Sequence, residues 1–108
     1  MLHNLITIQV TGFTQTEAQA GLPDLLAEFG ERPWLLNPLA TWDEASQSIL
    51  IQIERAQEDG DRNGEGTLDE VWDCVIATID FSSPKITFRI VSIQPLDDKN
   101  KTTNAVAG

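Results

Sequence analysis

Three stretches of the chain alternate between apolar and polar residues with the period of two that is typical of β-strands. They are residues 5–10, 49–54 and 85–93. A fourth stretch, residues 33–43, is apolar but contains two prolines. Proline cannot donate to a sheet ladder, so this stretch is predicted to be an edge strand. A helix over residues 45–58 is the alternative for the second stretch, because its isoleucines also fit helical spacing.

The clearest helical pattern follows residue 67. Thr67 and Glu70 have the spacing of a capping box, which predicts that a helix begins there. The Ser-Ser-Pro sequence at residues 82–84 ends it, because proline disfavours helical geometry in the residue before it. The predicted buried stripe of this helix consists of Leu68, Val71, Trp72, Val75, Ile76 and Ile79.

A second helix is predicted before the first proline-rich stretch. Thr14 and Glu17 again have capping-box spacing, and apolar residues recur from Leu22 to Phe29. Pro23 interrupts this pattern, so the helix is expected to be kinked or to begin near Leu22. Gly30 is expected to be the C′ residue that ends it.

The element order is therefore β-α-β-β-α-β, which predicts a ferredoxin-like α+β fold. In that fold two helices cover one face of a four-stranded antiparallel sheet, and the first and third strands are central. Residues 1–96 are predicted to form a single domain, followed by a flexible tail over residues 97–108, which is poor in apolar residues. The face under the helices is predicted to hold Ile6, Ile8, Val10, Ile49, Ile51, Ile53, Phe88 and Ile90.

The opposite, open face of the sheet is predicted to be mixed in polarity, with enough leucine and valine to suggest a partner. Its predicted members are Leu5, Thr7, Gln9, Leu50, Gln52, Glu54, Thr87, Arg89 and Val91, with Trp42 as a further candidate.

Charge narrows the possible partners. The 108 residues include 17 acidic and 7 basic side chains, which gives a formal net charge of −10. This balance disfavours binding to nucleic acid and to anionic membrane surfaces. The single cysteine excludes an internal disulfide framework and a cysteine-rich zinc site. The first residues lack the pattern of a signal peptide, so the cytoplasm is the expected location.

The residues before the second predicted helix match a calcium-binding loop. Asp59, Asp61, Asn63, Gly64 and Glu70 satisfy the pattern D-x-[DN]-x-[DN]-G-x5-E. Such a loop supplies the oxygen ligands that Ca²⁺ prefers, and the glycine permits the sharp turn between them. The preceding residues are predicted to be a strand, however, whereas a true EF-hand has a helix there.

A second register of the same loop begins at Asp61 and adds Glu65 as a ligand. It places Trp72 where the bidentate glutamate should stand, so neither register is complete. The alternative is that these are ordinary turn residues. Calcium is the only cofactor that the sequence suggests, and its candidate ligands are Asp59, Asp61, Asn63, Glu65 and Glu70.

Catalytic residues are not indicated. Nothing in the sequence brings His3 together with Cys74 as a nucleophile pair, and Cys74 is better explained as an inert helix residue beside the core. No carboxylate pair stands in an apolar stretch that would raise a pKa. The sequence therefore predicts a protein that is not an enzyme.

The predicted function is a small acidic interaction or assembly protein without catalytic activity, which associates with itself or with another protein. A homodimer through the open face is expected, because closed homodimers are the commonest oligomers. One alternative is a calcium-responsive binding protein that uses residues 59–70. Another is an acidic inhibitor or immunity-type protein for a basic partner. The candidate partner-binding residues are Leu5, Leu50, Gln52, Arg89 and Val91.

Overall fold

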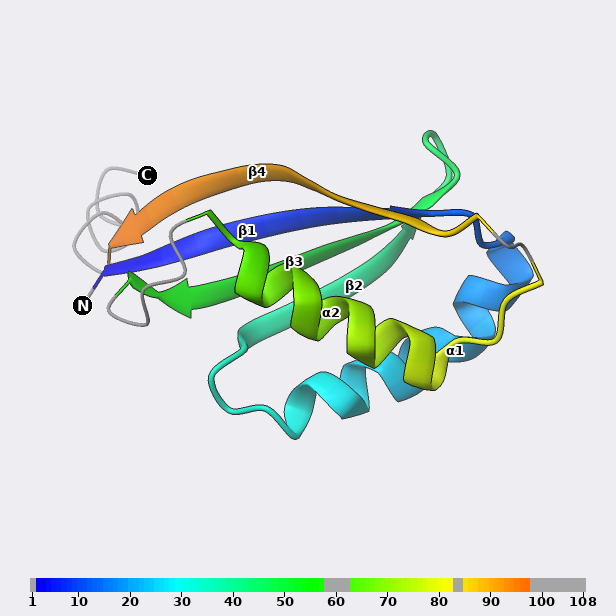
Figure 1. Ribbon diagram of the computed structural model, residues 1–108, viewed down its shortest axis with the longest axis horizontal. Coiled ribbons are helices and arrows are strands. Elements are labelled where there is room, and N and C mark those ends of the chain that lie inside the picture. Colours follow the sequence, from blue (N-terminus) through cyan, green and yellow to red (C-terminus); the bar gives the residue numbers. More distant parts are fainter. Residues whose placement is uncertain (1, 58–62, 83–84, 98–108) are drawn as a thin grey trace, which may run out of the picture.

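The computed structural model describes residues 2–57, 63–82 and 85–97 (Figure 1). In chain order they form β1 (Leu2–Thr11), α1 (Gln15–Gly30), β2 (Leu36–Asp43), β3 (Ser48–Ala56), α2 (Glu65–Thr78) and β4 (Thr87–Asp97). The strands make an antiparallel sheet in the order β2-β3-β1-β4, and both helices lie on one face of it. The predicted ferredoxin-like α+β fold is confirmed.

The strand order also agrees with the predicted central and edge positions. β1 and β3 are central, while β2, which contains Pro38, lies at one edge and β4 at the other. The helical alternative for residues 45–58 is wrong, because β3 pairs with a strand on each side.

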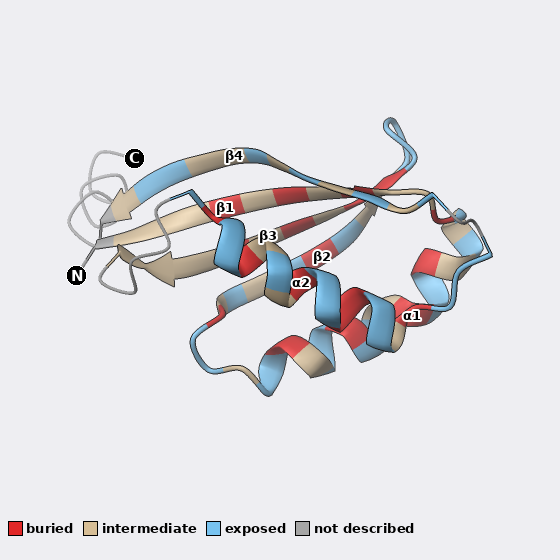
Figure 2. Ribbon diagram, in the orientation of Figure 1, coloured by how far each residue is buried: buried red, intermediate tan, exposed pale blue. Residues whose placement is uncertain are grey.

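The core is built on the pairing of β1 with β3. Branched aliphatic side chains stand directly opposite each other on the face that the helices cover, and all of them are fully buried (red in Figure 2). The opposed pairs are Ile6–Ile53, Ile8–Ile51 and Val10–Ile49. The helices close this layer from above with Ala18, Leu25, Phe29, Val71, Cys74 and Val75.

A β-bulge changes the face of the second half of β4. The register against β1 shifts between Thr7 and Ile8, and Val91 is the extra residue on β4. Ile93 therefore lies on the helix-covered face, where it pairs with Ile6 and packs against the core. Uninterrupted alternation would have placed Ile93 on the open face.

The start of α1 is capped as predicted. The Glu17 backbone N–H donates to Thr14 Oγ1 at 3.1 Å, and the Thr14 backbone N–H donates to Glu17 Oε1 at 2.9 Å. The helix then continues through Pro23, so the alternative start near Leu22 is wrong.

The end of α1 differs from its prediction. Gly30 is the last helical residue, and Glu31 follows as the C-cap in the right-handed helical region, with φ −80° and ψ −5°. The prediction of Gly30 as a C′ residue outside the helix is wrong. Gly30 is itself part of the helix, so the left-handed conformation that favours glycine is not required at this position.

α2 begins one turn of chain earlier than predicted. Its N-cap is Gly64, which adopts the left-handed region with φ 75° and has no side chain to cap the helix. Thr67 is fully buried instead, and its hydroxyl accepts a hydrogen bond of 2.9 Å from Arg55 Nη1. The predicted capping box of Thr67 and Glu70 is therefore wrong.

The buried face of α2 is rotated away from part of the predicted stripe. Trp72 and Ile76 are 39% and 44% exposed, so the prediction that they belong to the core is wrong. Trp72 lies against β4, with its ring 4.2 Å from that of Phe88 in an edge-to-face arrangement. The residues that α2 buries are Thr67, Val71, Cys74 and Val75.

Trp42 lies on the helix-covered face. It pairs with Ile49 on β3 and packs against the core, so its predicted place on the open face is wrong. Its indole Nε1 is buried, and no group of the described residues accepts a hydrogen bond from it.

Replacing Ile51 with alanine should lower the free energy of unfolding by about 2–5 kcal/mol, because the change leaves a cavity in the centre of the core. Val91→Ala is the matched control: it shortens a side chain that is 48% exposed and should cost under about 1 kcal/mol. Urea unfolding followed by circular dichroism measures both. Equal losses would contradict the burial of Ile51 at the centre of the core.

Candidate functional site

The predicted calcium loop lies only partly within the described residues. Asp59 and Asp61 fall outside them. Asn63 Oδ1 accepts a hydrogen bond of 3.2 Å from the Glu65 backbone N–H, as in an ordinary turn before a helix. No group of three or more histidine, cysteine, aspartate or glutamate side chains is arranged to hold a metal ion in residues 2–57, 63–82 and 85–97. A calcium site in this loop stays a prediction.

Glu70, the predicted bidentate ligand, is held in a polar cluster. Trp34 Nε1 donates to its two carboxylate oxygens at 2.8 and 2.7 Å, and Arg55 Nη1 lies 3.4 Å from Oε2. The same Arg55 nitrogen donates to Thr67. The cluster ties the chain before β2, the end of β3 and the first turns of α2 together. Sequence spacing gave no sign of it, because Trp34 and Glu70 are 36 residues apart.

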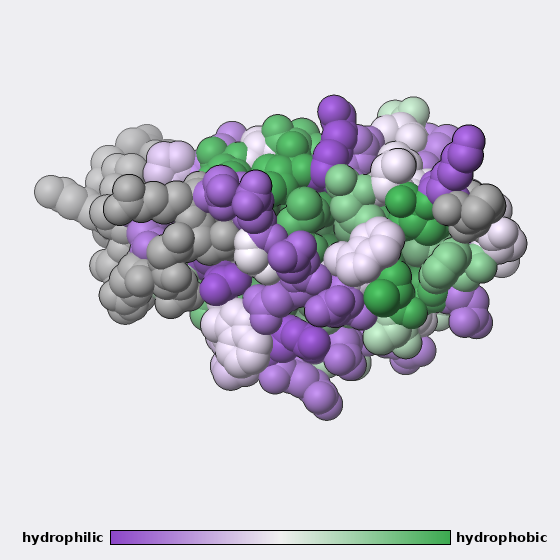
Figure 3. Space-filling model, in the orientation of Figure 1, coloured by the Kyte–Doolittle hydropathy of each residue, from purple (hydrophilic) through white to green (hydrophobic). Residues whose placement is uncertain are grey.

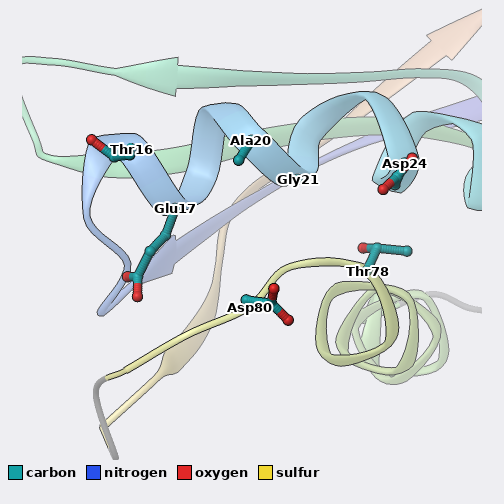
Figure 4. Close-up of a pocket in the computed structure, with 7 residues that line it drawn as sticks. All are labelled: Thr16, Glu17, Ala20, Gly21, Asp24, Thr78 and Asp80. Carbon is teal, nitrogen blue, oxygen red and sulfur yellow. The ribbon is translucent and has the colours of Figure 1, made fainter.

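A pocket of about 300 Å³ lies between α1 and the end of α2 (Figure 4). One face of α1 supplies most of its wall, because residues at intervals of four share a helix face. The segment that ends α2 supplies the other wall. The lining residues are Thr16, Glu17, Ala20, Gly21, Asp24, Thr78 and Asp80.

Close contact between the two walls sets the floor of this pocket. A Cβ atom on Gly21 would lie 2.6 Å from Ile79 Cγ1, so only glycine permits this approach. Ile79 is itself buried, and the residues on either side of it, Thr78 and Asp80, turn toward the pocket. The pocket is thus fixed to the packing of the two helices.

Glu17 has a structural role as well as a place in the pocket. Its Oε2 accepts hydrogen bonds of 2.9 Å from both the backbone N–H and the hydroxyl of Ser82. The bond from the Thr14 backbone N–H, followed by the Ser82 hydroxyl, holds the pKa of Glu17 below its ordinary value. This carboxylate is therefore ionised at neutral pH and joins the start of α1 to the chain after α2.

Asp24 and Asp80 are the other two carboxylates of the pocket, and both are exposed. Neither has a hydrogen-bond partner within the part of the chain that the structure describes. The Thr78 hydroxyl donates to the Cys74 carbonyl at 2.7 Å and keeps its lone pairs for a ligand. Since no basic side chain lines the pocket, the arrangement attracts positive charge.

Of the predicted partner-binding residues, Leu5, Leu50, Gln52 and Arg89 lie on the open face of the sheet, and Val91 is the unpaired residue of the bulge in β4. Leu5, Leu50 and Gln52 are half-buried on the central strands, whereas Arg89 and Val91 are exposed on β4. Two hydrogen bonds join side chains of different strands on this face. Arg89 Nε donates to Gln9 Oε1 at 2.9 Å, and Gln9 Nε2 donates to Ser48 Oγ at 3.1 Å.

His3 and Cys74 lie on opposite sides of the sheet. His3 belongs to the open face, where its Nδ1 is 3.4 Å from Glu54 Oε1. Cys74 is buried on α2, and this burial raises the pKa of its thiol. The structure therefore does not bring these two residues together as a nucleophile pair.

Membrane-spanning length is not reached by any helix within the described ranges.

No protein-family model matches the chain, and no curated protein matches its sequence. Among solved structures, the chain is similar to a proposed antibiotic biosynthesis monooxygenase from Chloroflexus aurantiacus J-10-fl. The two are 15% identical with a TM-score of 0.44, and the match covers 85% of this chain and 94% of the other. A likeness this distant concerns the fold alone and supplies no reaction, cofactor or substrate.

The predicted function requires a correction after this comparison. The sequence indicated a non-catalytic interaction protein, whereas the protein of similar structure is named as an enzyme. The comparison contradicts that predicted function, and neither it nor its two alternatives is proposed as the function of this chain. The comparison does not test the expected association with a second copy, which stays a prediction. The contacts of His3, Cys74 and the pocket carboxylates do not identify any of them as a catalytic residue.

Replacing Glu17 with glutamine should lower stability at neutral pH and leave it little changed in acid. A carboxylate whose pKa is depressed by folding stabilises the protein above the ordinary value of 4.5, and that contribution is lost as the pH falls through the folded-state pKa. Thermal unfolding from pH 3 to 7 measures the difference between wild type and variant. Asp73→Asn, on the exposed side of α2, is the control. If both variants lose the same stability relative to wild type at each pH, the role of Glu17 is contradicted.

Proposed function

We propose that this chain binds a small organic cation in the pocket between α1 and the end of α2, either as a ligand or as the charged part of a substrate. One observation carries the proposal: a pocket of about 300 Å³ carries three carboxylates and no basic side chain. A volume of this order is at the lower end of small-molecule sites.

The shape of the pocket favours an organic amine over a bare metal ion. A metal ion needs several oxygen ligands that converge within about 2.0–2.6 Å of one point. The pocket carboxylates come from separate turns of α1 and from the chain after α2, and no metal-holding group is formed in the described part of the chain. A diamine has two charges separated by methylene groups, which suits carboxylates spread around an apolar floor of Ala20 and Gly21.

The electrostatic setting supports the same class of ligand. Glu17 is ionised at neutral pH, and its hydrogen bonds hold its pKa below the ordinary value. The formal net charge of −10 attracts cations toward the surface. The pair energies are small, because exposed ion pairs contribute only about 0.2–1 kcal/mol each. A Kd near 1 mM, which corresponds to about −4 kcal/mol, is the affinity that such contacts sustain.

The expected cytoplasmic location also stays a prediction beside this function.

Isothermal titration with 1,4-diaminobutane at low ionic strength tests the proposal. Wild type should bind one equivalent, and Asp24→Asn and Asp80→Asn should each weaken binding about 2- to 5-fold, since each removes one exposed ion pair. Replacing both should weaken binding by about 10-fold if the two sites are independent.

Asp69→Asn and Asp73→Asn are the matched controls. They remove the same charge from exposed positions of α2 outside the pocket and should leave the affinity within about 2-fold of wild type. Equal losses in the control and pocket variants would show diffuse charge attraction and overturn the proposal. Absence of binding by wild type at ~20 mM 1,4-diaminobutane, which is about 20 times the expected Kd of ~1 mM, would also overturn the proposal.

A further inference from the structure

Negative charge is concentrated on one side of this molecule. The two helical segments, residues 15–32 and 65–80, contain nine carboxylates and a single basic residue, Arg32. Hydrophilic side chains accordingly cover much of the helical layer (purple in Figure 3). The carboxylates are Glu17, Asp24, Glu28, Glu31, Glu65, Asp69, Glu70, Asp73 and Asp80.

The open face of the sheet is close to neutral. Its described strand side chains include two carboxylates, Glu54 and Asp43, and one cation, Arg89, which leaves a single net negative charge. Glu54 is held in place, because its Oε2 accepts a hydrogen bond of 3.0 Å from Asn37 Nδ2 and its Oε1 lies near His3. In a chain with a net charge of −10, this face is the surface where an acidic molecule meets the least repulsion.

The same face also exposes apolar side chains between the polar ones. Leu39 is 50% exposed on the edge strand β2, opposite Gln52. The half-buried Leu5 and Leu50 lie beside it on the central strands. No element of the described residues covers this face (Figure 1). The mixture of apolar and hydrogen-bonding side chains is typical of the centre and rim of a protein interface.

We propose that a second copy of this chain covers the open face, so that two sheets pack face to face in a two-fold symmetric dimer. The charge distribution identifies the occupant. Two sheets that pack about 10 Å apart hold their helical layers on the outside, more than about 20 Å from each other. That separation exceeds the Debye length of about 8 Å at physiological ionic strength, so repulsion between the acidic layers is screened.

The size of the face agrees with this occupant. Four strands spaced about 4.8 Å apart, with eight residues each at about 3.3 Å, give a projected area of roughly 500 Å². The relief of the side chains increases the accessible area above this value, toward the ~800 Å² per partner of a standard interface. A basic partner, by contrast, would be attracted to the helical layer, where the carboxylates lie. The proposal does not depend on the cation pocket, which is on the opposite side of the molecule.

Sedimentation equilibrium of the full chain tests the dimer. Wild type should be dimeric at micromolar concentrations, and Leu50→Asp should weaken association at least ~10-fold, because it places two like charges in the middle of the interface. Ile76→Asp is the matched control: it adds the same charge at a side chain that is 44% exposed on α2, and it should leave the dimer intact. Leu39→Asp, also on the open face at a side chain that is 50% exposed, should weaken association without touching the core.

Higher salt should strengthen the association or leave it unchanged, because the protomers repel each other. A wild-type monomer at concentrations up to several hundred micromolar would overturn the proposal. So would a dimer that Ile76→Asp dissociates while Leu50→Asp and Leu39→Asp, with wild-type circular dichroism, do not. Association that weakens steeply with salt would also overturn it, because the contact would then involve the acidic helical layer.

Discussion

The pairing of β1 with β3 is the constraint on which the other features of this molecule depend. Along these two strands isoleucine and valine stand directly opposite each other and are fully buried. A shift of one residue would carry all of these side chains to the open face, so their burial specifies the register. The same register places Arg55 at the end of β3, beneath the start of α2, where it reaches Thr67 and Glu70.

Burial of one sheet face separates the surface into two regions with different chemistry. Both helices must lie on the apolar face, so the charged sides of the helices become one acidic layer. The pocket between α1 and the end of α2 belongs to that layer and exists because Gly21 allows α1 to approach Ile79. The open face holds the alternate residues of the strands, and most of these residues are uncharged. Its low charge is therefore a consequence of strand periodicity and distinguishes it from the helical layer.

Strand alternation and capping chemistry are local signals, and they predicted the element order, the central strands and the start of α1. The start of α2 was mispredicted, because Thr67 and Glu70 have capping-box spacing but bind Arg55 and Trp34, which lie far away in the sequence. The face of Trp42 was mispredicted because the β-bulge near Asn37 sets the alternation of β2, and Asn37 has a positive φ of 47°. The pocket joins residues 16–24 to residues 78–80 across a helix contact, and sequence spacing carries no signal for such a contact.

The central claim is that the two regions have separate roles, with a cation at the helical layer and a second copy at the open face. Amide chemical shifts of the ¹⁵N-labelled chain test both roles in one experiment, recorded during addition of 1,4-diaminobutane and again on dilution. The account predicts amine-dependent shifts confined to residues 16–24 and 78–80, and dilution-dependent shifts at residues 5–9, 50–54 and 87–91. Amine-dependent shifts spread over all the carboxylates of both helices, or dilution-dependent shifts at Trp72 and Ile76 in place of the open face, would contradict it.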